Sequence, residues 1–237
     1  MTGLEGKRVL VTRPRQQAGS LVDKLSAMGA IPILFPAIEI RTAVENPALD
    51  RAINELETYK WIIFTSVNGV QAFWQRVEEL RPGKAVFQDN KVAAIGPKTA
   101  RALQERGVRV DFVPGEYRAE AILNGLGDVR GLKILLARTD LARKNLLDLL
   151  IGTGALAEEI SVYQVVPAQV DPLTMVELSQ GIDIATFTSS STVRNFLALS
   201  GGIGRKAHGY IINDREKMAR FPSAWMVMGT IRLPPIS

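Results

Sequence analysis

The chain has 237 residues, of which 46% are apolar and 22% charged, a composition that is typical of a folded protein and excludes overall disorder. It contains no cysteine and a single histidine, His208, which excludes disulfides and a thiolate nucleophile and argues against a histidine-based metal site or catalytic triad. No apolar run reaches the roughly 18 residues that cross a bilayer, and charges stand where a signal peptide would be apolar. We therefore expect a cytoplasmic protein without a membrane partner.

The net charge of +5 is unevenly distributed along the chain. Residues 201–237 contribute +4 of it, from six Lys or Arg against two acidic side chains. The first 200 residues contain no basic run and no pattern of a recognition helix, and a DNA-binding face needs several clustered phosphate contacts. We expect no nucleic-acid partner. His208 lies in this basic tail, where a lone, solvated histidine is expected to have no function.

Short β-branched segments alternate with amphipathic ones as far as about residue 200. A first helix is predicted within residues 16–30, where Leu21, Leu25 and Met28 are spaced by three to four and Gly29 suits the C-terminal cap. Strands are predicted, in chain order, at residues 7–13, 31–40, 61–66, 91–96, 109–114, 133–138, 159–166 and 182–189. Apolar strands that alternate with helices indicate an α/β fold of the doubly wound type, with mostly parallel sheets.

Part of the sequence is repeated. "KRVLVTRP" at the N-terminus is similar to "LKILLART", and this similarity aligns Arg13 with Arg138, 125 positions later. Gly29 falls on Gly154 at the same offset, and Phe64 falls on Phe187 at an offset of 123. A period this long is that of a duplicated β/α unit, so we expect two similar domains.

The two extended segments 35–42 and 159–167 match each other at offset 125 and are interpreted as crossings between the domains. A first domain of residues 1–38 plus 166–237 and an inserted second domain of residues 39–165 follow, joined by a two-stranded ladder. Division at the midpoint of the chain is the alternative.

Small hydroxyl, amide and glycine residues follow several predicted strands, where helices are expected to begin. Ligands of parallel α/β sheets bind at this edge, and helix N-termini attract carboxylates and phosphates. The candidates for anion binding are Thr12, Thr65, Ser66, Asn68, Gly96, Lys98, Thr99, Ser189 and Ser191. The alternative role of such residues is ordinary helix capping. The glycine-rich phosphate-binding fingerprints are absent, so a nucleotide is not the favoured ligand.

Arg13 and Arg138 end equivalent predicted strands, where each could form paired hydrogen bonds with a carboxylate. The alternative is a surface ion pair, such as Arg138 with Asp140. Tyr163 lies in the second crossing segment. Its phenol faces a ligand, or the side chain is a half-buried strand aromatic.

Four segments together resemble bacterial uroporphyrinogen-III synthases over about residues 5 to 200. They are "GKRVLVTRPRQQAGSLVDKLSAMGA", "WIIFTSVNGVQAF", "KVAAIGPKTARALQERGVRVDFVPGEYRAEAIL" and "TFTSSSTVRNFL". The order of the "TRP", "FTS-x-NGV" and "IGPKTA" motifs is the specific part of the resemblance. It implies two α/β domains joined by a two-stranded ladder, in a monomeric enzyme that uses no metal or organic cofactor.

The resemblance further implies closure of hydroxymethylbilane, a linear tetrapyrrole with eight carboxylates, into uroporphyrinogen III with inversion of the last ring and loss of water. The substrate would bind in the cleft between the domains. Tyr163 matches the tyrosine that is the best candidate for assisting loss of the hydroxyl, and Thr99 belongs with Gly96 to the Gly-x-x-Thr turn. Ser66 and Ser191 lie in the two Thr-Ser turns.

The tail departs from the family pattern, because no counterpart of "VAAIGPKTARALQERGV" follows Gly201 and no clear strand–helix alternation is visible. The first domain is therefore expected to have an incomplete C-terminal part and to lack its last two strands and helices. A non-catalytic or impaired tetrapyrrole-binding paralogue and an anion-sensing regulatory module with this fold are the alternatives to an active synthase.

Overall fold

The computed structural model describes residues 4–43, 45–83, 86–116, 119–139, 145–188, 190–201 and 208–211. The chain divides into two compact units, Met1–Glu39 with Val166–Ser237 and Ile40–Val165. The first boundary lies one residue after the expected residue 38. Both crossings between the units fall within strands, β3 (Ile38–Arg41) and β7 (Leu156–Pro167), which are hydrogen-bonded neighbours in one sheet.

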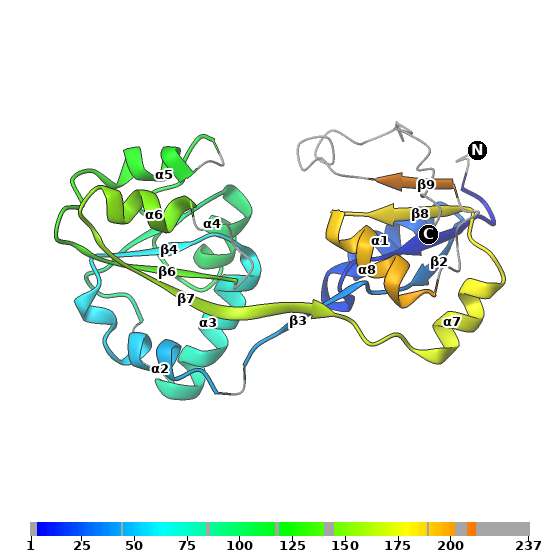
Figure 1. The fold of residues 1–237 in the computed structure, drawn as a ribbon, viewed down its shortest axis with the longest axis horizontal. Coiled ribbons are helices and arrows are strands. Elements are labelled where there is room, and N and C mark those ends of the chain that lie inside the picture. The colour runs from blue at the N-terminus through cyan, green and yellow to red at the C-terminus, as the bar shows by residue number, and fades with distance from the viewer. Residues whose placement is uncertain are drawn as a thin grey trace. The chain divides into compact units, whose positions relative to one another are not determined.

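The first unit is a parallel sheet in the order β2-β1-β8-β9 (Figure 1). Its described elements are β1 (Arg8–Val11), α1 (Arg15–Ala27), β2 (Ile31–Leu34), α7 (Pro172–Ser179), β8 (Ile184–Phe187), α8 (Ser190–Leu199) and β9 (His208–Ile211). Helix α1 buries Leu25 against Val9 and Val11 on one face. The other face packs Leu10 with the aromatic ring of Phe196 in α8. Apolar residues that alternate along β1 thus serve two cores.

The second unit has a sheet in the order β3-β7-β6-β4-β5, in which β7, β6, β4 and β5 are parallel (Figure 1). Its further elements are α2 (Pro47–Asn54), a short 3-10 helix (Leu56–Thr58), β4 (Trp61–Phe64), α3 (Val67–Leu80), β5 (Lys91–Ala94), α4 (Pro97–Gln104), α5 (Ala119–Leu126), β6 (Lys133–Thr139) and α6 (Asn145–Gly152). Helices α2, α3 and α4 bury apolar side chains on one face of the sheet, and α5 and α6 do so on the other. Both sheets are the parallel, helix-covered type that the sequence predicts.

The two units share strand registers, which confirms the duplication. Val9 in β1 pairs with Ile184 in β8, and Ile134 in β6 pairs with Trp61 in β4, at the offsets of 125 and 123 read from the sequence. The β1–β2 and β6–β7 pairs also have equivalent registers. The hydrogen bond from Gly6 N to Gly29 O likewise recurs from Gly131 N to Gly154 O.

The glycine predicted to cap the first helix does so by a left-handed conformation. Gly29 has φ +77°, its N–H donates to Ser26 O, and the N–H of Ala30 donates to Leu25 O. This pair of hydrogen bonds is the Schellman motif, in which glycine avoids the strain that a Cβ would introduce. Gly154 closes α6 in the same way at φ +86°.

Two predicted strands differ from those observed. The stretch 31–40 forms two strands, because the ladder to the β1 segment changes register after Phe35. Phe35 N donates to Val11 O, but Ala37 N donates to Thr12 O instead of Arg13 O. Residues 109–114 form only an isolated parallel bridge between Phe112 and Ala93. The carboxylate of Asp111 accepts from Val92 N at 2.9 Å, which supplies β5 with a side-chain acceptor instead of a strand ladder.

The expectation that the first domain lacks its last two strands is wrong for residues 208–211, which form β9. His208 pairs with Ile184 as Lys91 pairs with Trp61 in the second unit, so β9 occupies the place of β5 in the duplication. His208 therefore lies in a strand and not in an irregular segment. Strand β9 consists of only four residues, His-Gly-Tyr-Ile, which are too few to show the alternation by which a strand is recognised.

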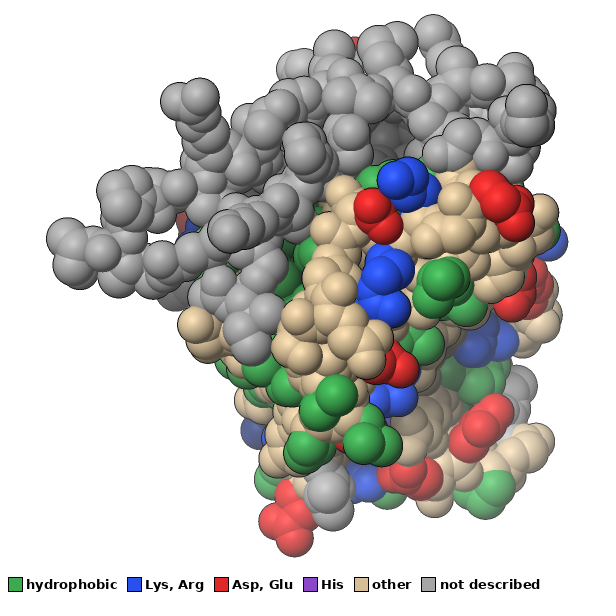
Figure 2. Space-filling view, turned by 90° about the vertical axis from the view of Figure 1, so that its right-hand side faces the viewer, with side chains coloured by type: hydrophobic (Ala, Val, Ile, Leu, Met, Phe, Trp, Pro, Cys, Tyr) green, Lys and Arg blue, Asp and Glu red, His purple; other side chains and the backbone are tan. Residues whose placement is uncertain are grey.

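The face of the protein shown in Figure 2 carries charged side chains of both signs with hydrophobic side chains singly or in small groups between them. Leu173 and Val176 of α7 are exposed by 73% and 57%. Scattered exposure of this kind is common on protein surfaces.

We predict that two glycine substitutions have opposite effects on stability. A Cβ would meet no atom within 4 Å at Gly19, inside α1, or at Gly107, which has φ +76° after α4. Gly19→Ala should stabilise by about 0.5–1 kcal/mol through helix propensity, and Gly107→Ala should destabilise by about 1–2 kcal/mol through left-handed strain. Urea unfolding of both variants measures the difference, and destabilisation of equal size at both positions would contradict the backbone explanation.

A second prediction concerns the ion pair between α2 and α3. Arg76 Nε lies 2.6 Å from Asp50 Oδ1, and this hydrogen bond lowers the pKa of the Asp50 carboxyl. A lowered pKa gives stability that is present above the unfolded pKa of about 3.9 and is lost as the pH falls through the folded value. Asp50→Asn should cost about 1 kcal/mol at pH 7 and less than that at pH 2.5, which lies below the unfolded pKa. Urea unfolding at both pH values checks this, and an unchanged difference would assign the effect to packing.

Candidate active site

Most of the predicted site residues of the second unit gather at one edge of its sheet. Thr65 and Ser66 follow β4, Gly96 follows β5, and Arg138 lies near the end of β6. Because these strands are parallel, their carboxyl ends meet at the same edge. The backbone hydrogen bond from Ile95 N to Phe64 O joins the turns after β4 and β5.

Ser66 brings the first predicted turn into contact with Tyr163. The serine is the N-cap of α3, and its Oγ accepts from Gly69 N at 3.0 Å. The same oxygen lies 3.1 Å from the hydroxyl of Tyr163, and either group can donate this hydrogen bond. The capping role and the contact with the tyrosine therefore coexist in one side chain.

The position of Tyr163 depends on a β-bulge in β7. Arg138 pairs with Ser161, but Thr139 pairs with Tyr163, so Val162 is the extra residue. In a regular strand Val162 and Tyr163 would point to opposite faces, whereas here both are buried in the same core beneath α3. The bulge thus turns the phenol toward the N-terminus of α3, although Tyr163 is only 6% exposed.

Gly69 allows this close approach. A Cβ at this position would lie 3.2 Å from Ser66 Oγ and 3.3 Å from Ala137 O, both tighter than ordinary contacts. The glycine of the "VNG" motif therefore lets the first turn of α3 lie against β6. Asn68 is half-buried in the same turn.

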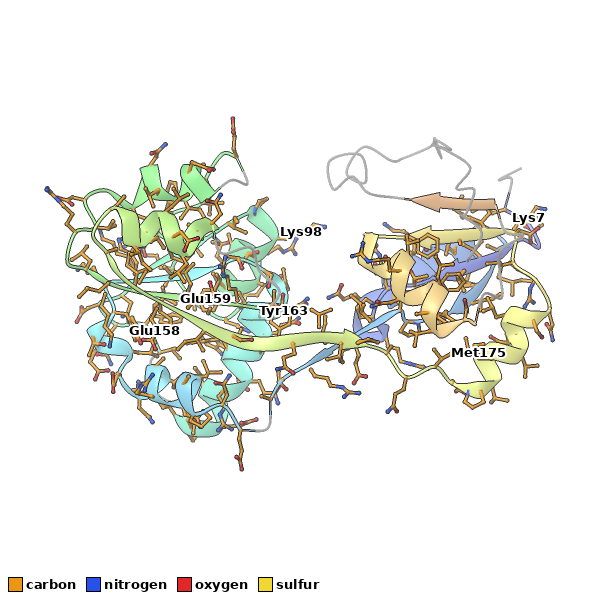
Figure 3. The ribbon with its side chains drawn as sticks, viewed as in Figure 1. Lys7, Lys98, Glu158, Glu159, Tyr163 and Met175 are labelled. Carbon is orange, nitrogen blue, oxygen red and sulfur yellow. The ribbon has the colours of Figure 1, made fainter. Side chains whose placement is uncertain are left out.

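The second turn of the site begins α4. Gly96 is its N-cap in an extended conformation, and Pro97 is the first helical residue. Thr99 is 5% exposed in the first helical turn, while Lys98 beside it is exposed (Figure 3). The N-termini of α3 and α4 thus both present N–H groups and positive dipole ends at this edge.

Arg138 forms an ion pair that the sequence analysis missed. Its Nε lies 2.8 Å from Glu159 Oε2 in β7, its terminal nitrogen contacts the same oxygen, and the arginine is 4% exposed. Glu159 is labelled in Figure 3. The alternative partner, Asp140, lies outside the described residues. The available signal was an arginine at the end of an apolar predicted strand, where a partly buried charge requires a nearby acid.

Arg138 lies on the opposite face of the sheet from Tyr163. Residues 134 and 136 of β6 belong to the core under α5 and α6, whereas residues 135 and 137 belong to the core under α3. The alternation along the strand places Arg138 with the first of these. The structure therefore brings Ser66 and Tyr163 together, and it does not bring Arg138 to them.

In the first unit Thr12 has a structural role. It is fully buried and its Oγ1 donates to Thr186 O at 2.6 Å, while Thr186 Oγ1 donates to Leu10 O at 2.8 Å. These reciprocal bonds join β1 to β8. Arg13 follows Thr12 and is half-buried, and this burial lowers the pKa of its guanidinium. Ser191 lies in α8, and Ser189 lies outside the described residues.

Among the described residues, no three His, Asp or Glu side chains are grouped so that they could hold a metal ion. Within the same part of the chain, none of the helices has the length and hydropathy of a membrane span. This edge of the second unit therefore offers hydrogen-bond donors from three sources. They are the N-termini of α3 and α4, the hydroxyls of Ser66 and Tyr163, and the ammonium group of Lys98.

Comparison with known proteins places the chain beside one family. A family profile described as "Uroporphyrinogen-III synthase HemD" matches residues 19–212. The uroporphyrinogen-III synthase of Synechococcus elongatus is 32% identical over 202 residues, which are 83% of this chain and 75% of that protein. The porphyrin biosynthesis protein HemD of Ruminiclostridium josui is 30% identical over 82% of this chain, and the match covers 40% of that longer protein.

The fold is also that of a solved structure. A uroporphyrinogen III synthase variant from the extreme thermophile Thermus thermophilus superposes with a TM-score of 0.59 at 21% identity, covering 87% of this chain and 84% of that one. This likeness concerns the fold alone. Together with the family profile and the relatives, it confirms the resemblance drawn from the sequence motifs: the chain belongs to the uroporphyrinogen-III synthase family.

Proposed function

We propose that this chain converts hydroxymethylbilane into uroporphyrinogen III, with loss of water and inversion of the last pyrrole ring. Membership of the family and the names of its relatives support this activity over a non-catalytic or regulatory role. The structural observation that carries the proposal is the hydrogen-bonded pair of Ser66 and Tyr163 at a helix N-terminus. We also propose, from the resemblance to the family alone, that the protein is a monomer and that it is located in the cytoplasm.

Tyr163 is assigned to the departure of the substrate's hydroxyl. A hydroxyl leaves as water when it gains a proton as its bond to carbon breaks, and a phenol can donate that proton. The same pyrrole gives up its N–H proton, which restores the phenol, and an electrophilic azafulvene remains. The last ring attacks the azafulvene with its already linked carbon, and the spiro intermediate that results allows this ring to be inverted before the macrocycle closes. Because the azafulvene reacts without further activation, the protein mainly has to hold the chain in the productive geometry.

The carboxylates of the substrate are assigned to the N-termini of α3 and α4. Thr65, Ser66 and Asn68 surround the first, and Gly96, Lys98 and Thr99 form the second. Free N–H groups and the positive ends of helix dipoles stabilise carboxylates at such positions. In the first unit Arg13, Ser189 and Ser191 are assigned the same role. Thr12 is assigned there as well, through its backbone, since its hydroxyl is buried and bonded to Thr186 O.

The test uses freshly prepared hydroxymethylbilane and separation of the product isomers. The wild-type chain should yield uroporphyrinogen III, whereas spontaneous closure gives isomer I. Tyr163→Phe should lower kcat about 100-fold with little change in KM, as expected for loss of a proton donor. Tyr59→Phe is the matched control, because Tyr59 is also buried but its hydroxyl donates to Glu158 at 2.6 Å, near the amino end of β4.

Tyr59→Phe should lower stability and leave kcat unchanged. Thr99→Ala should raise KM or lower kcat on its own, since Thr99 lies in the second turn. Turnover of the double variant Tyr163→Phe with Thr99→Ala at the wild-type rate would contradict the assignment of both residues.

Arg138 needs a separate test, because its ion pair affects stability whether or not it binds substrate. Glu159→Gln should destabilise by about 3 kcal/mol, since it leaves a buried guanidinium unpaired. Replacing both partners, Arg138→Met with Glu159→Leu, should recover most of that loss. If Arg138 also binds a carboxylate, the recovered double variant should still show a raised KM. An unchanged KM would restrict Arg138 to a structural role.

A further inference from the structure

We propose that Ser66 is a positioning residue that sets the direction of the Tyr163 proton. The inference rests on the proposed function, and it concerns which of two hydroxyls donates in the bond between them. In the structure the two oxygens are 3.1 Å apart. The choice of donor decides which group keeps a proton for the substrate.

The first step of the argument is the bond that Ser66 already accepts. Gly69 N–H donates to Ser66 Oγ at 3.0 Å, from the first turn of α3. A hydroxyl that accepts a hydrogen bond becomes a better donor, because the bonds of a chain polarise one another. The bond from Gly69 therefore favours donation by Ser66 to the oxygen of Tyr163.

The second step compares the two arrangements. If Ser66 donates, the bonds run in one direction, from Gly69 N–H through the serine to the phenol, and the proton of Tyr163 is left for a ligand. If Tyr163 donates, two donors converge on one serine oxygen and the phenol has no proton to give. Only the first arrangement suits a tyrosine that assists loss of a hydroxyl.

The third step is that the protein holds the two oxygens in place. Gly69 lets α3 lie against β6, and the bulge at Val162 turns Tyr163 into the core beneath the same helix. Tyr163 is 6% exposed, so its ring has little freedom to leave the serine. Ser66 therefore acts on the substrate through Tyr163, in addition to capping the helix.

Two variants of Ser66 with side chains of the same shape, Asp and Asn, separate the donor role of the residue from its capping role. Asp and Asn are both strong N-caps, so Ser66→Asp and Ser66→Asn should both keep α3 and unfold at similar midpoints. The aspartate can only accept hydrogen bonds and draws the Tyr163 proton to itself, whereas the asparagine can still donate. We expect kcat of Ser66→Asp to be about tenfold or more below that of Ser66→Asn. Any repulsion of substrate carboxylates by the aspartate should appear in KM.

The same pair is then measured in a Tyr163→Phe background. Without the phenol the kcat difference between Asp and Asn should disappear, since it acts through Tyr163. A difference that persists, or equal kcat values with Tyr163 present, would overturn the inference while the formation of uroporphyrinogen III by the wild type still supports the proposed function. A wild type that yields only isomer I would overturn both.

A second isosteric pair covers the case in which an aspartate at this position does not fold. Ser66→Thr retains the acceptor and the donor, and Ser66→Val retains neither. Ser66→Thr should keep a higher kcat than Ser66→Val, and this difference too should vanish with Tyr163→Phe. If Ser66 only capped the helix, Ser66→Val would lower the unfolding midpoint equally with and without Tyr163. The ratio of the kcat of Ser66→Thr to that of Ser66→Val would then also be the same in both backgrounds.

Discussion

The hydrogen bond between Ser66 and Tyr163 joins the N-terminus of a helix to a bulged strand, and the candidate active site is arranged around it. It needs three local conditions: a capping serine, a glycine that admits the helix to β6, and an extra residue in β7. Each condition is common in α/β proteins. Their coincidence brings a capping group and a phenol together at the edge where parallel sheets bind ligands.

The duplication preserved the backbone frame and changed the side chains attached to it. The hydroxyls of Thr12 and Thr186 join β1 to β8 by hydrogen bonds. The equivalent residues of the second unit are Ala137 and Ile63, which are buried and apolar. Glu159, which pairs with Arg138, is equivalent to Leu34 beside the strand that leads to Arg13. Conserved hydrogen-bond registers with altered polarity allow each unit to specialise without a new fold.

Much of the architecture could be predicted from the sequence, because apolar runs, capping glycines and the 125-residue offset each have a direct structural meaning. The Thr-Ser turn before α3 was also predicted, because hydroxyl residues directly after an apolar strand indicate the start of a helix. The bulge was not, since Val162 and Tyr163 are both compatible with a regular strand and nothing in their order marks an extra residue. Glu159 was missed because its partner is 21 residues away and the pairing depends on the register of β6 with β7. The break between β2 and β3 was missed, because it comes from a change of register at Ala37 that the sequence of residues 31–40 does not mark.

The insertion of one unit within the other affects the order in which the chain can fold. Arg8 at the start of β1 donates its N–H to Asp183 just before β8, a partner 175 residues later. Since the ribosome adds roughly 5–20 residues per second, about 10 to 35 seconds pass between the synthesis of β1 and that of its neighbour β8. Residues 40–165 are continuous and can complete their core in that interval. The N-terminal strand can pair early with β2 but only late with β8, so the candidate site of the second unit is synthesised before the first unit can complete its sheet.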